Sequence, residues 1–364
     1  MGKLRVGVVG ATGTSGAVAT RLVLGHPMLS LAFATSDRAA GASVAETLGT
    51  TPDTGARFAS HESVASMTAA CDAVLLATSA EVSARLAPLF ADDGKQVVDL
   101  SGAFRLDADG AKKWYGIAHA PASWLERAHY GLPELFGAPA VPALAGQAPA
   151  LAGQAASLAG GAGALVSNPG CYPTAALLAL GPLVRAGLVE PDGIIVDAKS
   201  GITGAGRQTG EAYSFLEVHA DVRAYKVLAH QHTPEIERAL SRFAPGVRLT
   251  FTAHLLPIAR GLLATCYARP RPGVTAGRVK ECLADAYSAA PFVRAVPIED
   301  VMLKRVVGTN LALVGASAND DVVIALGAID NLLKGAAGQA VQNLNLMNGW
   351  DQALGLEGLQ RAAA

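Results

Sequence analysis

One cysteine stands on a tight turn at the start of an apolar segment. Residues 167–174 have the sequence SNPGCYPT, in which proline and glycine form the turn, and residues 175–180 have the composition of a buried helix. Thr174 is the predicted N-cap of that helix. The partial positive charge at a helix N-terminus favours thiolate over thiol, so the pattern predicts a nucleophilic Cys171. A buried structural cysteine is the alternative.

Two imidazoles and an acid follow in the sequence AHQHTPEIE at residues 229–237. A thiolate nucleophile needs a proton donor and acceptor, and His230 and His232 suit general acid-base work with Glu235 orienting or charging one of them. Two alternatives stay open at this point. The imidazoles could ligate zinc with His254 as a third ligand, or they could form a cluster that caps a helix.

Basic side chains on glycine-rich loops, or directly after predicted strands, are candidates for holding an anionic substrate. Arg binds carboxylate or phosphate with two hydrogen bonds. A basic residue on a loop is more often a solvated surface residue. Only its combination with the other motifs makes it a candidate for substrate binding. The candidates are Arg105, Lys199, Arg207 and Arg260.

A glycine-rich loop, GATGTSG, lies between a predicted strand at residues 4–10 and a predicted helix at residues 17–24. Such glycines let the backbone turn tightly and approach a phosphate, which the helix N-terminus attracts. The GxxGxxG spacing departs from GxGxxG, and an ordinary glycine-rich turn is the alternative. The loop predicts a dinucleotide site built from Gly10, Thr12, Gly13, Thr14, Ser15 and Gly16.

The end of the second predicted strand, residues 29–36, is where the adenine ribose of a dinucleotide would lie. Ser36 and Arg38 offer a hydroxyl and a guanidinium there, which suit the 2′-phosphate of NADP better than a free 2′-hydroxyl. Asp37 leaves NAD open, because an acid that points inward can bind a 2′-hydroxyl. The sequence favours NADP.

The elements that must position these residues alternate between strand and helix over the first part of the chain. Further strands at residues 73–77 and 96–100 predict a doubly wound parallel sheet. Low-complexity residues 138–164 then form a predicted surface insertion. The later segments predict a second, mixed or antiparallel α+β domain and a final helix, with strands at 193–198, 247–254, 262–268 and 322–328 and the helix at 331–347.

Length and composition limit the function classes. The chain has 364 residues, enough for two domains, and its 29 basic and 30 acidic residues give a net charge of -1. That balance argues against a general nucleic-acid surface or an electrostatic membrane anchor. The four cysteines are scattered without a CxxC pair, which predicts a reducing, cytoplasmic compartment. We therefore expect a small-molecule partner, and no metal.

Nearly the whole chain, in order, resembles the N-acetyl-gamma-glutamyl-phosphate reductases of arginine biosynthesis. Shared ancestry with aspartate-semialdehyde dehydrogenases is also expected, although GCYPT at 170–174 and HQHTPE at 230–235 are closer to the acetylglutamyl enzymes. Departures occur at residues 79–81 and 102–103. The resemblance is carried by residues 10–16, 99–106, 130–135, 168–174, 197–201, 204–207, 224–226, 230–237 and 330–343.

The resemblance implies NADPH-dependent reduction of N-acetylglutamyl 5-phosphate to the 5-semialdehyde through a thioester on Cys171. His230 would be the acid-base residue with Glu235 in support, and His232 is the rival assignment. Asn168 and backbone amides would stabilise the oxyanion. The resemblance places Arg105, Lys199, Arg207 and His232 at the substrate, and Ser101 and Gly204 near the nicotinamide.

The resemblance also implies a discontinuous first domain, because the final helix returns to it. A Rossmann-type NADP-binding domain would comprise residues 1–165 with 331–364, and an α+β catalytic and dimerisation domain residues 166–330, in a homodimer or homotetramer. Three rival functions remain: another semialdehyde dehydrogenase, including an aspartate-semialdehyde or carrier-bound lysine-pathway reductase; a thiol acyltransferase or hydrolase; and a dinucleotide sensor without catalysis.

Overall fold

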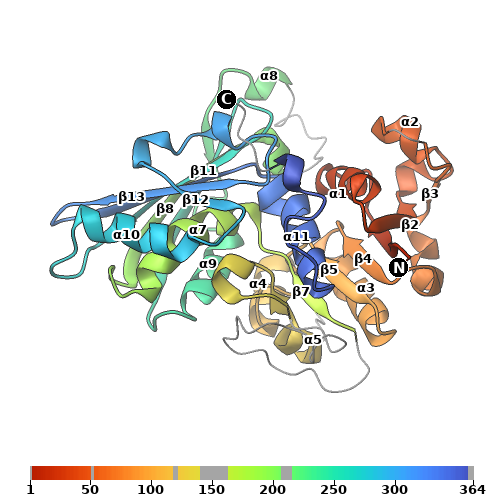
Figure 1. The fold of residues 1–364 in the computed structure, drawn as a ribbon, viewed down its shortest axis with the longest axis horizontal. Coiled ribbons are helices and arrows are strands. Elements are labelled where there is room, and N and C mark those ends of the chain that lie inside the picture. Colours follow the sequence, from red (N-terminus) through yellow and green to blue (C-terminus); the bar gives the residue numbers. More distant parts are fainter. Residues whose placement is uncertain (1, 51–52, 118–121, 140–162, 206–214, 360–364) are drawn as a thin grey trace. The chain divides into compact units, whose positions relative to one another are not determined.

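The chain forms two compact units in the computed structural model, which describes residues 2–50, 53–117, 122–139, 163–205 and 215–359 (Figure 1). Unit 1 comprises residues 1–169 and 336–357, and unit 2 comprises residues 170–335 with the segment that begins at Gly358. The sequence placed the boundaries at 165/166 and 330/331, whereas the units divide at 169/170 and 335/336. Unit 1 is therefore assembled from two separate stretches of chain.

A parallel sheet forms the centre of unit 1. Its strands lie in the order β3-β2-β1-β4-β5-β7-β6, and all neighbouring strands are parallel. A central β1 with the chain winding outward on both sides is the arrangement of doubly wound nucleotide-binding folds, so the Rossmann-type prediction is confirmed. The strands are β1 (Leu4–Val9), β2 (Leu29–Thr35), β3 (Phe58–Ala59), β4 (Ala73–Leu76), β5 (Gln96–Asp99), β6 (His129–Tyr130) and β7 (Leu165–Ser167).

Helices bury both faces of this sheet. One face packs against α1 (Thr14–Gly25) and α11 (Gly338–Met347), and the other against α3 (Ala80–Asp92) and the 3-10 helix η2 (His61–Ala70). Val6 and Val8 of β1 belong to the first core and Val9 to the second, because successive side chains of a strand point to opposite faces. The other helices of unit 1 are η1 (Asp37–Ala39), α2 (Val44–Leu48), α4 (Ala108–Tyr115), α5 (Ala122–Arg127) and α6 (Pro133–Phe136).

A mixed sheet forms the centre of unit 2, which confirms the predicted α+β character. Its order is β12-β13-β14-β11-β8-β10-β9; β8 runs parallel to β10, and β11 is antiparallel to both β8 and β14. The strands are β8 (Asp192–Gly201), β9 (Arg223–Tyr225), β10 (Arg248–Leu256), β11 (Leu262–Ala268), β12 (Val293–Ala295), β13 (Ala312–Ala318) and β14 (Val323–Ile329).

The two faces of this second sheet differ. Three helices pack on one face, which we call the covered face: α7 (Cys171–Arg185), α9 (His232–Leu240) and α10 (Ala276–Tyr287). Figure 1 shows α7 and α10 along one side of β13 and β8. The opposite, open face carries half-exposed side chains, and Ile195 on it is 46% exposed. The remaining helical segments are η4 (Ile202–Ala205), α8 (Phe215–Val218), η6 (Ile298–Asp300), η7 (Leu303–Arg305), a π-helical turn η8 (Leu333–Ala337) and η9 (Glu357–Leu359).

None of the described helices has the length and apolar character needed to cross a bilayer.

Candidate active site

Cys171 is the first residue of α7, with Gly170 as its N-cap. The prediction of Thr174 as N-cap is wrong, because the helix begins three residues earlier. Pro173 fits in its first turn, where the N–H groups have no intrahelical partner. The Thr174 hydroxyl instead donates to the Gly170 carbonyl at 2.9 Å. The half-buried thiol thus lies at the positive end of a helix, as a nucleophile requires.

The other cysteines have different surroundings. Cys71 and Cys266 are buried, and burial raises the pKa of Cys71 to about 11 and of Cys266 to about 12. Burial also raises the pKa of the Cys282 thiol. Raised values suppress the thiolate, so these three positions suit structural roles and Cys171 is left as the candidate nucleophile.

Glu235 supports the turn that carries Cys171. Its side chain, in a residue that is 1% exposed, accepts a hydrogen bond from the Gly170 amide at 2.9 Å. Its second oxygen lies 3.9 Å from His232 Nε2. The structure therefore brings Glu235 to His232 and to the N-cap of α7.

His230 lies beside His232, with the two ring centroids 4.7 Å apart, but has other hydrogen-bond partners. The residue is 3% exposed, and its ring lies 5.6 Å from the Tyr172 ring, 5.5 Å from Tyr225 and 5.0 Å from Phe251, centroid to centroid. Its Nδ1 accepts a hydrogen bond from the His232 backbone amide at 3.2 Å. Burial, with a smaller contribution from the Lys226 ammonium, lowers the pKa of His230 to about 4. The ring is therefore neutral near pH 7.

Two tyrosines complete this aromatic cluster, and the sequence analysis did not single them out. The hydroxyls of Tyr172 and Tyr225 lie 3.0 Å apart, and the Tyr172 hydroxyl donates to the His254 carbonyl at 3.4 Å. Burial is the main cause of the raised pKa of Tyr172. The only sequence signal for Tyr172 was its position next to the cysteine. The only signal for Tyr225 was that it lies in a segment, residues 224–226, that carries the family resemblance.

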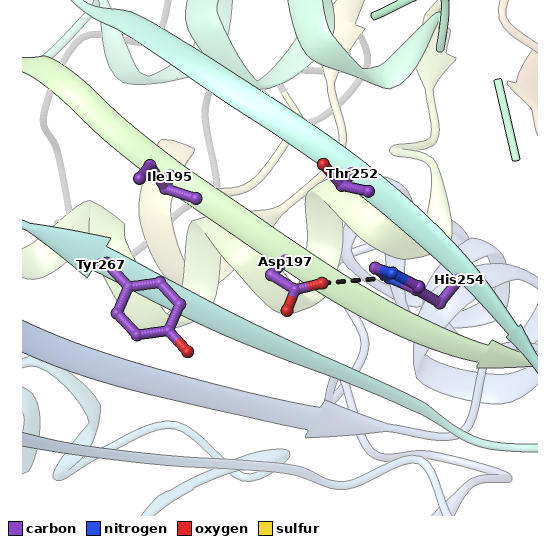
Figure 2. A pocket seen from close by; sticks show the side chains of 5 residues that line it. All are labelled: Ile195, Asp197, Thr252, His254 and Tyr267. Atoms are coloured by element: carbon purple, nitrogen blue, oxygen red, sulfur yellow. Dashed lines mark ion pairs between the residues drawn. The ribbon is translucent and has the colours of Figure 1, made fainter. Parts of the chain in front are cut away.

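The three-histidine zinc alternative is not formed. His254 Nδ1 pairs with Asp197 at 3.0 Å on the open face of the sheet, as Figure 2 shows, whereas His230 contacts Phe251 and Tyr172 on the covered side. The described residues contain no group of three His, Cys, Asp or Glu side chains that could hold a metal ion.

Lys199 also lies on the open face. Its ammonium is 2.6 Å from the second oxygen of Asp197, next to the open pocket that Ile195, Asp197, Thr252, His254 and Tyr267 line. Alternate residues of β8, among them Ala198 and Ser200, are fully buried. Since α7 packs on the covered face, the structure does not bring the Lys199 ammonium toward Cys171.

The glycine-rich loop of unit 1 needs its glycines for packing. Gly10 has a φ of +80°, and a Cβ there would lie 2.4 Å from the Ala77 carbonyl oxygen. A Cβ on Gly16 would lie 2.1 Å from the Gly10 carbonyl oxygen. Gly13 is the N-cap of α1, which begins at Thr14 and continues with Ser15. The loop therefore directs the start of α1 as a phosphate-binding loop does.

The loop is joined to the end of β2. The hydroxyls of Thr12 and Ser36 lie 2.6 Å apart, and the Arg38 guanidinium donates to the Thr12 carbonyl at 2.9 Å. Asp37 instead accepts hydrogen bonds from the backbone and ring of His61, both at 2.7 Å, and these lower its pKa. The guanidinium lies over the loop while the carboxylate is held by His61, an arrangement that fits a 2′-phosphate.

Ser101 forms part of a buried turn after β5. Its amide and hydroxyl donate to the Asp99 carboxylate at 3.0 and 2.8 Å, and its hydroxyl accepts from the Ala103 amide. Asp99 is fully buried, and burial raises its pKa. These contacts fix the backbone that leads to Arg105.

Arg105 and Asn168 hold the framework of unit 1 together. The Arg105 guanidinium donates to the Asn168 carbonyl at 2.9 Å and to the Leu100 carbonyl at 2.8 Å. The Asn168 side chain donates to the Ala336 carbonyl and accepts from Asn343. Both residues thus have structural contacts, and their roles at the substrate and the oxyanion stay predictions.

Gly204 lies in η4, next to Ser200, whose Oγ would be 2.5 Å from a Cβ at this position. The sequence reasoning gave no role to Asn331 and Asp330, which anchor this region. Asn331 accepts from the Gly261 amide and donates to Thr203. Arg260, a candidate for holding an anionic substrate, instead pairs with buried Asp330 at 2.9 Å. Arg207 lies outside the described residues, as does most of the 138–164 insertion.

Comparison with known proteins defines the class. Residues 5–140 match the NAD binding domain of semialdehyde dehydrogenases, and residues 171–331 match their dimerisation domain. Aspartate semialdehyde dehydrogenase II from Vibrio cholerae has the same fold, with a TM-score of 0.68 and 17% identity over 95% of this chain and 99% of that one. The enzyme from Candida albicans, solved with NADP, has a TM-score of 0.64 and 17% identity over 95% and 98%. Fold and domains are those of a semialdehyde dehydrogenase.

Curated relatives identify the family within the semialdehyde dehydrogenase class. The N-acetyl-gamma-glutamyl-phosphate reductase of Geobacillus stearothermophilus is 43% identical over 98% of this chain and 99% of its own length. The reductase of Magnetococcus marinus is 39% identical over 98% of both chains. The chain belongs to the N-acetyl-gamma-glutamyl-phosphate reductase family, whose members are NAD(P)-dependent oxidoreductases.

Proposed function

We propose that the chain catalyses the NADPH-dependent reduction of N-acetylglutamyl 5-phosphate to N-acetylglutamate 5-semialdehyde and phosphate, in arginine biosynthesis. The observation that carries this proposal is the half-buried thiol of Cys171 at the first position of α7, in a chain with curated reductases as full-length relatives. A hydrolase or acyltransferase would use the same thiol but would have no use for the glycine-rich loop.

The proposed reaction passes through a thioester. The Cys171 thiolate attacks the acyl carbon, a C–S bond forms, and the C–O bond to phosphate breaks with phosphate as the leaving group. The nicotinamide, when bound, supplies the hydride that reduces the thioester. Collapse of the resulting thiohemiacetal breaks the C–S bond and frees the aldehyde and the thiolate. The covalent intermediate divides one difficult displacement into two easier steps.

NADP is the proposed cofactor. Arg38 donates to the Thr12 carbonyl of the phosphate-binding loop, which puts a permanent positive charge beside the expected position of the 2′-phosphate. Asp37, the residue that left NAD open, is held by His61.

A homodimer is the proposed assembly. Residues 171–331 match a dimerisation domain, and the open face of the second sheet carries an apolar side chain, Ile195, that is 46% exposed. A second copy packed on this face would remove the exposed part of Ile195 from water. This face is the surface that we assign to the second copy of the chain.

The direct test measures NADPH formation in the reverse direction. Protein, N-acetylglutamate 5-semialdehyde and NADP are mixed with or without phosphate, and a parallel reaction contains aspartate semialdehyde. We expect a phosphate-dependent signal with the acetylated substrate only. A preference for aspartate semialdehyde would show that the chain is an aspartate-semialdehyde dehydrogenase. The absence of NADPH formation with both substrates would refute the proposal.

Replacement of the nucleophile gives the first prediction. Cys171→Ser should lower turnover by about 10³-fold or more, since a serine hydroxyl is a far weaker nucleophile near neutral pH than a cysteine thiolate. NADPH affinity, measured by fluorescence titration, should be unchanged. Cys282→Ser is the matched control, because Cys282 is also half-buried and should retain full activity. Full turnover in the Cys171 variant would show that the thiol is structural.

A further inference from the structure

The hydrogen bond to His230 determines which ring nitrogen carries the proton. The His232 amide points its N–H at Nδ1 from 3.2 Å, so Nδ1 must present a lone pair. A neutral imidazole with an unprotonated Nδ1 carries its hydrogen on Nε2. The described residues offer Nε2 no hydrogen-bond partner, so this N–H is available to a ligand.

The groups around the ring oppose its protonation. Tyr172 from α7, Tyr225 from β9 and Phe251 from β10 contribute aromatic rings. The titratable groups nearby are the His232 imidazole, whose ring centroid lies 4.7 Å away, and the Lys226 ammonium, whose charge lowers the pKa of His230. A second proton on Nδ1 would face the His232 N–H, replacing a hydrogen bond by two opposed donors. Burial and Lys226 together lower the pKa of His230 to about 4. The neighbouring acid, Glu235, lies instead at the Gly170 amide and near the His232 ring.

The contacts also connect this ring to the nucleophile. Tyr172, whose ring packs edge-on against His230, is the residue that directly follows Cys171. The helix start of α7 and the imidazole are therefore held by the same aromatic side chain. An Nε2–H donor held rigidly in this way can stabilise charge that develops on a substrate oxygen.

We propose that His230 acts as a neutral hydrogen-bond donor, through Nε2–H, to the acyl oxygen of the substrate, and that it is not the base that removes the proton of Cys171. This inference rests on the proposed reductase function. The Cys171 proton passes to solvent when the thiolate forms. Negative charge then develops on the acyl oxygen in each tetrahedral intermediate. When the intermediate collapses, an electron pair of this oxygen re-forms the C=O bond, and the charge leaves with phosphate or with the Cys171 thiolate. Neither step needs a net proton from the ring.

Three variants of His230 distinguish a role as hydrogen-bond donor from a role as general base. In His230→Gln the side-chain amide places an N–H near the position of Nε2 but has no basic nitrogen, whereas His230→Asn places its N–H near Nδ1, and His230→Ala has neither. We expect kcat to fall about 10-fold in the Gln variant and about 10²- to 10³-fold in the Ala and Asn variants, the cost of losing an oxyanion donor. Equal losses in the Gln and Ala variants would overturn the donor role.

The pH dependence of Cys171 alkylation tests the second half of the proposal. Iodoacetamide labelling of Cys171, measured by mass spectrometry without substrate, should have the same pH midpoint within about 0.3 units in wild type and all three variants, because the thiolate does not depend on His230. An upward shift of about one unit or more in every variant would show that His230 stabilises the thiolate, and would refute the proposal.

The tautomer itself is measurable in the wild-type protein. ¹⁵N NMR of selectively labelled histidine should show an unprotonated Nδ1 and a protonated Nε2 for His230 between pH 6 and 8; protonation at Nδ1 would refute the inference whatever the turnover. This readout and the alkylation need no substrate. A wild-type protein inactive on N-acetylglutamate 5-semialdehyde would instead refute the proposed function, so the two failures are distinguishable.

Discussion

Two histidines that are equivalent in the sequence have different surroundings in the structure. Both imidazoles contact the Tyr172 ring, but His230 accepts a backbone hydrogen bond, whereas His232 lies 3.9 Å from the Glu235 carboxylate. The sequence contained both imidazoles and the acid but could not pair them, because the pairing depends on where α9 begins. That helix begins at His232, so His230 remains on the preceding turn.

Cofactor preference is a residue-scale prediction. Arg38→Asp should lower the ratio of NADP to NAD affinity by about 10²-fold, because a charge-assisted hydrogen bond is lost and a like charge then faces the 2′-phosphate. Fluorescence titration with both reduced cofactors measures the ratio. Arg85→Asp, which reverses the charge of an exposed arginine on α3, is the matched control and should leave the ratio unchanged. Unchanged discrimination in the Arg38 variant would remove Arg38 from the 2′-phosphate site.

At the scale of elements, the glycine-rich loop and α1 form one packed unit. Gly16→Ala should destabilise the protein by about 1–3 kcal/mol and weaken NADPH binding, because the added methyl group would meet the Gly10 carbonyl. Gly25→Ala is the control at the other end of the same helix, where nothing lies within 4 Å of a Cβ, and it should change stability by less than about 1 kcal/mol.

Urea unfolding and a cofactor titration measure both effects. Equal behaviour of the two alanine variants would show that the loop tolerates a side chain at residue 16, and the assignment of a closely packed phosphate loop would then fail.

Sequence patterns predicted the strands around the site well and its side-chain partners poorly. The strand predicted at 262–268 is β11, and that at 29–36 is β2 within one residue, because apolar runs report burial directly. The pattern did not show that Lys199 would pair with Asp197 on the open face, since that depends on which face of the sheet α7 covers. Nor could it find the Tyr172–Tyr225 pair, which joins residues far apart in the chain.

At the scale of the whole molecule, assembly is the property that one substitution can test. Ile195→Asp should weaken the homodimer at least 10-fold in sedimentation equilibrium, because it places a second carboxylate beside Asp197 on the open face. Leu89→Asp is the matched control, since Leu89 is also 46% exposed but lies on α3 of unit 1. A dimer of unchanged affinity in the Ile195 variant would exclude the open face as the interface.

The return of the chain to unit 1 affects the order in which the protein can fold during synthesis. The strands of the first sheet have all been made by residue 167, yet Ala340, Leu344 and Met347 of α11 belong to the core on one of its faces. Unit 2 lies between, so the ribosome completes most of it before that face can be closed. A nascent chain released before residue 338 therefore exposes Val6, Val8 and their neighbours, an apolar surface for chaperones and proteases to bind.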